Sequence, residues 1–598
     1  MIKIRNDRTK PSYLPLLPVV IAVGFLPLLV HSFEYHTGLT VFDWFPDNSE
    51  MATDFFLGWK AIGIVLTALL AAILLYAGKR KEHRSIRFDN AFYMLLFYML
   101  FVAMSALFSP YKRWVVSGGY EILEPVWVLF AYGLLCFYTY HTVRNEQQLE
   151  VLFKFIGPGV AAGLLIGCTQ AAGHNFFETT IGKILIRSPS YWSDLKGLVF
   201  SVGQRVYITL YNPNYVPFYI GMILPVCIAL FINNRKWSAR IFLAILTIGA
   251  IICLIGSGTT TGWMAVLIAV LISGLVLLSR NKKRFLTGII LLAITGIAGL
   301  AAVSQTAAGS MLKDVVVGTY KADTDFGIRS IETGRDICIN YEGTVTHFTY
   351  ESDSSTGSLF VSAADDNGTP LEQSLTENGE YSFLDQKGSQ FIVAPAFLEE
   401  KAALSITIEE HSWIFMRQED GTYRYYNAAG KYVEFPSMKH VQWFNEDAFS
   451  GRGHIWNKTI PVLPKHILLG SGANTYLLEI PQEDYLFKNY TDTNNYFDVK
   501  AHNWFLQQWV ENGLLGTICL ITFYMCYFVS SIRLFRKISF KENIHRISFA
   551  LFVGLLIYMI SALANDPTVN VATLYWVGLG LGMSVNRMIA EKSKKEIL

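Results

Sequence analysis

The sequence predicts a polytopic α-helical membrane protein of about 12 transmembrane helices, with a β-rich extracytoplasmic domain inserted between helices 9 and 10. Three observations support this fold class. Only 16% of the 598 residues are charged, whereas soluble domains contain about 25%. Long apolar runs recur along the chain, and one acidic block interrupts them. These features exclude a disordered chain, a nucleic-acid-binding arm and an ordinary cytosolic enzyme.

The net charge of +2 conceals two regions of opposite sign. Residues 311–500 contain 15 Lys and Arg against 28 Asp and Glu, whereas the remaining residues contain 34 against 19. A region with the charge density of a soluble domain therefore lies within an apolar, basic frame.

Twelve runs are long and apolar enough to be read as spans, because crossing a bilayer takes about 20 mainly apolar residues. The first follows a basic segment without a small-residue cleavage site, so we expect a retained helix rather than a signal peptide. The predicted spans are 14–31, 55–77, 90–108, 124–140, 152–172, 212–232, 240–256, 260–279, 285–305, 503–530, 547–563 and 569–588.

The distribution of Lys and Arg predicts the orientation of these spans. Lys and Arg recur in the alternate connections, including 78–89, 280–284 and 531–546, whereas the loops 32–54, 257–259 and 564–568 contain none. Because cytoplasmic loops are enriched in these residues, both termini are predicted to be cytoplasmic. The acidic block then lies outside the cytoplasm.

The chain divides into four predicted parts. Residues 1–309 carry helices 1–9, and 503–598 carry helices 10–12. Residues 310–440 form a β-rich, sandwich-like insert, because short alternating runs such as 337–341 (ICINY) are separated by Gly, Asn, Asp and Ser turns. Residues 441–502 form an extracytoplasmic catalytic loop. Four aromatic residues of the insert are candidates for stacking on a glycan, with core or ordinary surface positions as the alternative: Trp413, Tyr423, Tyr425 and Tyr426.

Three residues on the predicted outer face suit transfer chemistry. His502 begins the tenth span, where an imidazole can accept a proton at neutral pH. Arg452 lies between two glycines, and Arg205 precedes an Asn-Pro-Asn turn. A guanidinium group pairs well with phosphate. Each also has a simpler interpretation: a helix-cap histidine, a loop arginine and an interfacial anchor.

For several other polar features the sequence favours a structural role over a functional one. Asp566, between the last two spans, is predicted to be a turn residue. The Gly- and Thr-rich run 257–262 lacks the lysine of a phosphate-binding loop. The acidic residues of the first outer loop are read as ordinary loop acidity. Neither a zinc-like Cys and His spacing nor, in the acidic block, a disulfide framework is evident.

Four stretches in order resemble the O-antigen ligase and O-antigen polymerase family of bacterial envelope glycosyltransferases. They are ALFSPYKRWVVSGGYEILEPVW (106–127), GQRVYITLYNPNYVPFYIGMILP (203–225), SGRGHIWNKTIPVLPKHILLGSGANTY (450–476) and AHNWFLQQWVENGLLG (501–516). The similarity covers most of the chain outside 306–440, and the extra β-rich block departs from the family pattern.

The resemblance implies a metal-independent glycosyltransferase in the bacterial plasma membrane. It would transfer a glycan from undecaprenyl diphosphate, outside the cytoplasm, to a hydroxyl of an acceptor glycan, lipid or protein. His502 would be the base, and Arg452 and Arg205 would bind the diphosphate. Further residues in the matching stretches would bind substrate: Asn214, His454, Gly470 and Gly472.

Two rival functions belong to other classes. A polysaccharide transporter or flippase would place charged residues near the bilayer midplane, whereas the candidate residues here gather on one face. A sensor would use the β-rich block to bind a ligand, but twelve spans exceed what an anchor requires. A protein O-oligosaccharyltransferase of the same family is a third alternative. Nucleic acid is not an expected partner.

Overall fold

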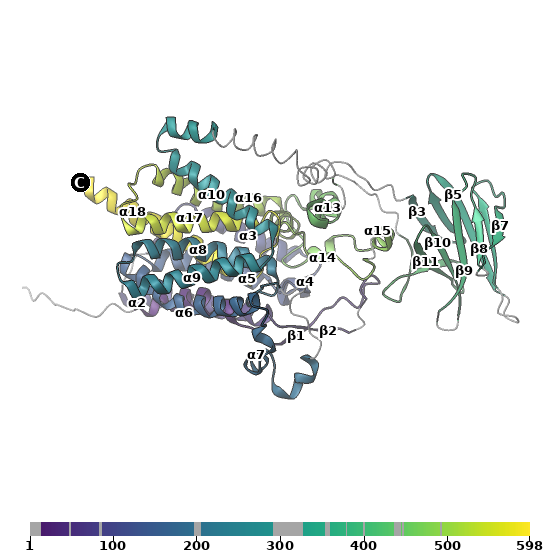
Figure 1. Ribbon diagram of the computed structural model, residues 1–598, viewed down its shortest axis with the longest axis horizontal. Helices are drawn as coiled ribbons and strands as arrows, with labels where there is room; N and C mark the ends of the chain where they lie inside the picture. The colour runs from purple at the N-terminus through teal and green to yellow at the C-terminus, as the bar shows by residue number, and fades with distance from the viewer. Residues whose placement is uncertain are drawn as a thin grey trace, which may run out of the picture.

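The computed structural model describes residues 13–46, 49–82, 86–195, 205–290, 327–352, 359–377, 380–398, 401–435, 444, 448–490 and 493–597. A bundle of long helices runs along the longest axis of the molecule, and a β-rich domain lies beyond one end (Figure 1). We call that end of the bundle the domain end. It is formed by residues 29–46, 49–57, 109–125, 173–186, 205–215, 448–490, 493–503 and 562–571.

Ten long helices make up most of the bundle. They are α2 (Gly58–Glu82), α3 (Phe92–Phe108), α5 (Val126–Thr142), α6 (Glu146–Ala171), α8 (Val216–Asn233), α9 (Trp237–Gly256), α10 (Thr260–Leu278), α16 (Trp504–Phe535), α17 (Asn543–Ser561) and α18 (Ala572–Ile597). Within the described residues, seven helices are long and apolar enough to cross a membrane. The chain is therefore a polytopic helical membrane protein, as predicted.

The predicted number of twelve spans remains a prediction. Helices lie at eleven of the twelve predicted positions within the described residues, but some are too short or too polar to count as spans. Most of the run 285–305 lies outside the described residues. The first run differs in shape from a regular helix. It forms short 3-10, α and π turns over Leu14–Leu28. Prolines 15, 18 and 27 each remove a backbone donor, which explains the interruptions.

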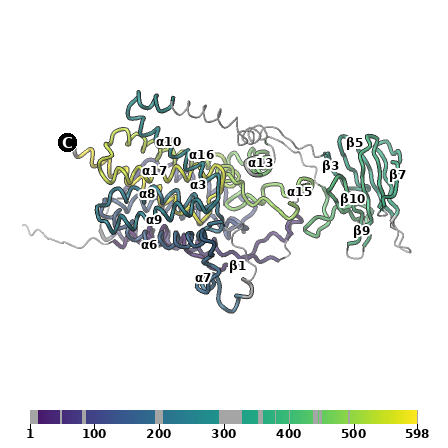
Figure 2. Tube along the Cα trace, in the orientation of Figure 1, coloured from purple at the N-terminus to yellow at the C-terminus, as the bar shows by residue number. Residues whose placement is uncertain are grey.

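The helices pack around one large apolar core. Helix α9 lies between α8 and α6, and α8 also packs on α17 (Figure 2). At Gly554 of α17, an added Cβ would lie 3.1 Å from the carbonyl oxygen of Gly221 in α8. The absence of a side chain thus lets two membrane helices approach closely.

The end of the bundle opposite the domain end is rich in ion pairs. Glu591 of α18 contacts Arg587 at 2.7 Å and Arg87 at 3.2 Å, and Lys592 contacts Glu542 at 2.6 Å. All of these residues except Arg587, which lies at the end of the last predicted span, belong to segments predicted to be cytoplasmic.

The β-rich domain contains two antiparallel sheets, as the alternating runs predict. One has four strands in sequential order: β3 (Ile328–Thr333), β4 (Ile337–Tyr341), β5 (Thr344–Ser352) and β6 (Leu359–Asp365). The other has seven, also sequential: β7 (Glu372–Leu375), β8 (Tyr381–Leu384), β9 (Gln390–Leu398), β10 (Lys401–Ile408), β11 (His411–Arg417), β12 (Tyr423–Tyr426) and β13 (Tyr432–Val433).

The two sheets enclose a common core. Phe348 of the first sheet and Phe391 of the second have ring centroids 5.3 Å apart. Trp413, Tyr423 and Tyr425 are buried within this core. The core interpretation of these aromatic residues is therefore confirmed, and they offer no surface on which a glycan can stack.

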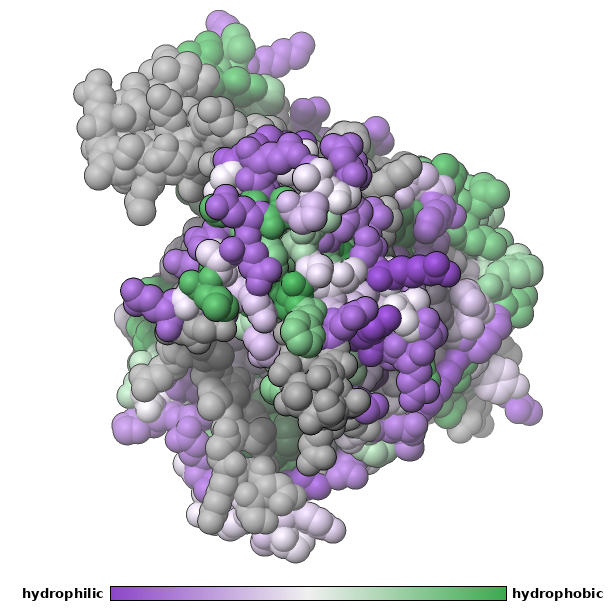
Figure 3. All heavy atoms as spheres, turned by 90° about the vertical axis from the view of Figure 1, so that its right-hand side faces the viewer, coloured by the Kyte–Doolittle hydropathy of each residue, from purple (hydrophilic) through white to green (hydrophobic). Residues whose placement is uncertain are grey.

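The β-rich domain also contacts the domain end of the bundle. Asn427 donates to the backbone carbonyl of Asp43 at 2.9 Å, and Lys431 donates to that of Phe42 at 2.9 Å. In the reverse direction, Asn489 of the short helix α15 (Tyr485–Tyr490) donates to the carbonyl of Ser412 in the β-rich domain at 2.7 Å. Seen from the side of the β-rich domain, the described surface is largely hydrophilic (Figure 3).

Candidate functional site

A cavity of about 780 Å³ at the domain end brings together residues from distant parts of the chain. Five of the seven predicted site residues line it. Its lining consists of Arg205, Asn212, Asn214, Gly258, Thr259, Thr260, Thr261, Gly451, Arg452, His454, Ile455, Phe487, Lys488, Thr493, Tyr496, Asp498 and His502. Because the volume falls in the range of pockets that hold ligands, this cavity is the candidate active site.

His502 is positioned by the start of α16. The side chain of Asn503 caps this helix by accepting hydrogen bonds from the amides of Phe505 and Leu506, at 3.1 and 3.2 Å. The His502 backbone has φ of 48°, a left-handed conformation that is uncommon for a residue with a side chain. The His-Asn pair of the sequence thus has a local explanation: the asparagine begins the helix, and the histidine turns into the cavity.

Asp566 lies against His502, a contact that the turn interpretation of this residue does not include. Its Oδ2 lies 3.4 Å from His502 Nδ1, and its side chain is 3% exposed. The carboxylate belongs to the connection between α17 and α18, far along the chain from His502. A short Asn-Asp-Pro run is typical of turns, so the local sequence gave no signal of this contact.

Burial and neighbouring charges shift the pKa values of this pair. Burial, together with the cations Arg452 and Lys500, lowers the pKa of His502 to about 4. Burial raises the pKa of Asp566 to about 7, against the opposing effect of Lys500 and Arg452. The imidazole is therefore neutral near pH 7 and able to accept a proton.

Arg452 extends from helix α13 (Ala448–Thr459) into the same region. Its Nη2 donates to the side-chain oxygen of Asn565 at 3.1 Å. Asn565 in turn donates to Thr261 Oγ1 at 3.3 Å. The neighbouring residues Asn565 and Asp566 thus contact Arg452 and His502 respectively, and no local pattern around them predicts either contact.

Arg205 and Asn214 lie in the segment that leads into α8. Arg205 Nε donates to the carbonyl of Ser257 at 3.3 Å. The side chain of Asn212 accepts a hydrogen bond from the amide of Asn214 at 2.9 Å, which caps the 3-10 turn Pro213–Tyr215. The Asn-Pro-Asn motif therefore builds a helix start beside the cavity, as its residues predict.

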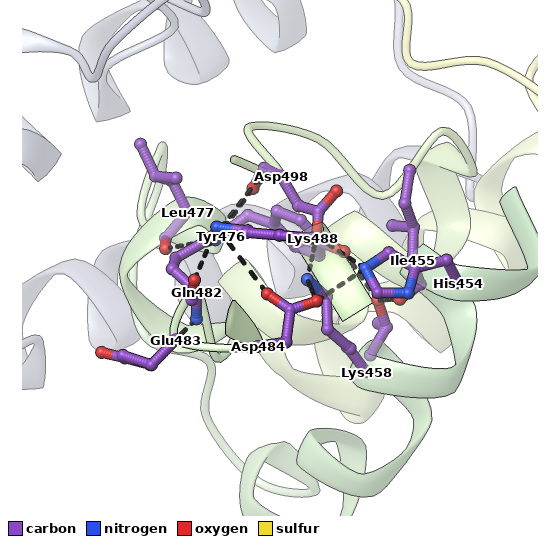
Figure 4. A network of polar contacts seen from close by, with 11 residues as sticks. His454, Ile455, Lys458, Tyr476, Leu477, Gln482, Glu483, Asp484, Lys488 and Asp498 are labelled. Atoms are coloured by element: carbon purple, nitrogen blue, oxygen red, sulfur yellow. Dashed lines mark hydrogen bonds and ion pairs between the residues drawn. The ribbon is translucent and has the colours of Figure 1, made fainter. Parts of the chain in front are cut away.

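His454 belongs to a buried charged network on another side of the cavity (Figure 4). Its Nε2 lies 2.8 Å from Asp484 Oδ2, and its ring stacks on Phe487 with centroids 3.7 Å apart. Lys458 contacts both Asp484 and Asp498. Burial opposes ionisation of Asp484, but Lys458 and His454 outweigh it and hold the pKa of this carboxyl well below its usual range.

Gly470 and Gly472 do not line the cavity. They dock their loop on α16 instead. The amide of Gly472 donates to the carbonyl of Glu511 at 2.8 Å, and a Cβ on Gly470 would lie 2.1 Å from the Glu511 carbonyl carbon. The helix departs from helical geometry nearby, at Gly513. The geometry gives both glycines a packing role.

Asn474 connects two of the motifs that the sequence holds far apart. Its side-chain oxygen accepts from the amides of Gly119 and Glu124, at 3.0 and 2.7 Å, and its amide donates to the carbonyl of Glu124 at 2.7 Å. The loop that contains Gly119 and Tyr120 is thereby fixed against the segment that leads from the cavity to α16.

No group of three or more His, Cys, Asp or Glu side chains suited to hold a metal ion occurs among the described residues. Residues 411–521 match a family model described as O-antigen ligase. The matched range contains Arg452, His454 and His502, together with the strands β11 to β13 and the first part of α16. No protein in a search of curated proteins matches the chain.

Proposed function

We propose that the chain transfers a glycan from an undecaprenyl diphosphate carrier to an acceptor hydroxyl, and the match of residues 411–521 to the O-antigen ligase family model supports this proposal. Envelope glycan transfer of this type uses a lipid-linked glycan and an acceptor. The observation that best supports the proposal is the cavity itself, which is lined by a histidine with a buried carboxylate partner and by two arginines.

His502 acts as the general base in this proposal. Its Nδ1 faces Asp566, so Nε2 is the nitrogen that takes the proton from the acceptor hydroxyl. The hydroxyl oxygen then bonds to the anomeric carbon of the donor sugar, and the bond from that carbon to the diphosphate breaks. Asp566 stabilises the imidazolium that forms.

Arg452 and Arg205 stabilise the leaving diphosphate. Negative charge builds on the diphosphate oxygens as the glycosidic bond breaks, and cations already in place lower the barrier. The Asn565 contact fixes the Arg452 guanidinium before substrate arrives. His454 and Asn214, which line the same cavity, are proposed to bind substrate. No metal, nucleotide or other cofactor takes part in this mechanism.

The proposal places the enzyme in the bacterial plasma membrane with both termini cytoplasmic and the cavity outside. Twelve spans with the β-rich domain between the ninth and the tenth follow from the excess of Lys and Arg in alternate connections. The acceptor is a hydroxyl of a glycan, a lipid or a protein.

A transfer assay in proteoliposomes tests this function. Lipid-linked oligosaccharide is extracted from cells that make the protein, and covalent transfer to a labelled acceptor is measured. Replacing His502 by Ala is expected to lower the rate by about 10²- to 10⁴-fold. The substitutions Arg452→Ala and Arg205→Ala are expected to lower it through lost charge stabilisation.

Arg424→Ala is the matched control, because this arginine pairs with Glu434 on the β-rich domain, and it should retain the wild-type rate. Full activity of the His502→Ala protein contradicts the base assignment. Movement of the lipid-linked glycan across the membrane without covalent transfer supports the transporter instead.

A further inference from the structure

One wall of the cavity differs in chemistry from the arginine-bearing side. It is contributed by α15 and the segment that follows it, and its lining residues are Phe487, Lys488, Thr493, Tyr496 and Asp498. This wall presents two aromatic rings, a hydroxyl, and a lysine and a carboxylate that are each paired with another buried side chain. The other side instead presents the guanidinium groups of Arg205 and Arg452, which suit an anionic leaving group.

Tyr496 is the exposed ring of this wall. It is 63% exposed, whereas Phe487 and Asp498 beside it along the wall are 8% and 5% exposed. An aromatic ring that is exposed to water in a cavity is unfavourable in free energy, and a ligand that covers the ring removes this cost. The face of a pyranose ring bears several C–H groups with partial positive charge, and these match the negative face of a phenol ring.

The wall behind Tyr496 is fixed before any ligand binds. Phe487 stacks on His454 with an interplanar angle of 9°. The amide of Asp498 donates to the side chain of Gln482 at 2.9 Å, and its carboxylate contacts Lys458. Because Phe487 and Asp498 are already held in place, a sugar that binds at this wall orders little beyond the Tyr496 ring.

The same wall is also attached to the β-rich domain. Tyr485, at the start of α15, packs in the core of that domain with its ring 5.6 Å from Tyr425. Asn489, one turn further, donates to the carbonyl of Ser412. Between these two anchors, Phe487 and Lys488 face the cavity. One short helix therefore joins the β-rich domain to the candidate active site.

We propose that this wall is a sugar-binding subsite in which Tyr496 stacks on a pyranose ring of the donor or of the acceptor. The inference rests on the proposed function and adds the class of group that the wall recognises. Tyr496 determines how tightly that saccharide binds, while His502 and Arg452 perform the chemistry.

The test measures KM and kcat separately for the two substrates in the proteoliposome assay. The donor is the extracted lipid-linked oligosaccharide, and the acceptor is the free oligosaccharide released from the same extract by mild acid. In Tyr496→Ala, KM for one substrate is expected to rise about tenfold or more, with kcat changed much less. A rise in the donor KM assigns the ring to the donor sugar, and a rise in the acceptor KM assigns it to the acceptor sugar.

Two further variants distinguish stacking from other roles. Tyr496→Trp retains a ring and should keep KM near the wild-type value. Phe360→Ala removes an equally exposed ring, also 63% exposed, from the β-rich domain, and should change neither constant. Unchanged KM values in Tyr496→Ala, or an equal loss in Tyr496→Trp, overturn the subsite. An inactive wild-type protein overturns the proposed function instead.

Discussion

His502 and Arg452 are each held by one of two consecutive residues in the connection between α17 and α18. Asn565 accepts a hydrogen bond from the guanidinium, and Asp566 faces the imidazole. A shift of this one connection would displace the proposed base and the proposed diphosphate ligand together. The geometry of the proposed reaction therefore depends on a loop that lies outside the recognised motifs.

The pair His502 and Asp566 predicts the pH dependence of transfer. As the pH falls through about 7, Asp566 takes up a proton, because burial raises its pKa to that value. The negative charge that stabilises the imidazolium in the transition state is then lost, so the rate should fall below about pH 7. Asp566→Asn should lower the rate by roughly 10²- to 10⁴-fold and remove this titration.

Rate measurements from pH 5 to 9 on both proteins check the prediction. The acid limb of the variant should move towards the lower pKa of His502, which is about 4. An acid limb that stays near pH 7 in Asp566→Asn would assign the titration to another group.

Some site residues could be identified from the sequence and others could not, because only some of them are marked by their local sequence. His502, Arg452 and Arg205 lie beside their own helix starts or glycines, so their local sequence marks them. Asp566 is marked only by its contact with His502, and Tyr496 only by its place in the cavity lining. Gly470 and Gly472 lie in a recognisable motif, but the motif reflects the docking of two backbones.

Among the elements, the contact between the loop at Gly470 and α16 leaves no room for a side chain. Gly470→Ala would place its Cβ 2.1 Å from a backbone atom of Glu511. Relieving this clash must move the loop or the helix, which should destabilise the protein by about 1–3 kcal/mol. Because α16 begins beside His502, transfer activity should fall as well.

Gly274 of α10 provides the matched control, because its added Cβ would meet nothing within 4 Å. Gly274→Ala should be neutral or stabilising by about 0.5–1 kcal/mol. The midpoint of thermal unfolding in detergent compares the two variants. Equal midpoints for Gly470→Ala and the wild type would show that the contact is looser than described.

The class of polytopic helical membrane protein was predictable because the thickness of a bilayer fixes the length of an apolar run. The β-strands were predictable because alternation and turn residues mark them. The interruption of the first helix depends on three prolines, whose effect hydropathy does not register. The placement of α15 between the cavity and the β-rich domain was not predictable, since it results from the packing of Tyr485 against strands 60 residues earlier.

On the scale of the whole molecule, the two ends of the bundle differ in what they expose. The β-rich domain and the cavity share one end, and the ion pairs of Glu591 and Lys592 lie at the other. The excess of Lys and Arg predicts that the second end is cytoplasmic. Labelling of single introduced cysteines in right-side-out spheroplasts measures this directly.

A membrane-impermeant maleimide should label Ser374→Cys on exposed β7 and should not label Ser539→Cys after α16. The wild-type chain is the background control, because all seven native cysteines are buried or half-buried. Burial also raises the pKa of the Cys338 thiol to about 11, so little reactive thiolate is present there. Labelling of Ser539→Cys alone would reverse the predicted orientation.

The way in which the β-rich domain is attached has a consequence for how such a protein diverges. Asn427, Lys431 and Asn489 all donate to main-chain carbonyl oxygens, and every residue type supplies such an oxygen. Residues 40–43 and 412 can therefore change identity over generations while these hydrogen bonds persist. Sequence drift in the first loop does not require a compensating change in the strands, so the two parts are free to evolve at different rates.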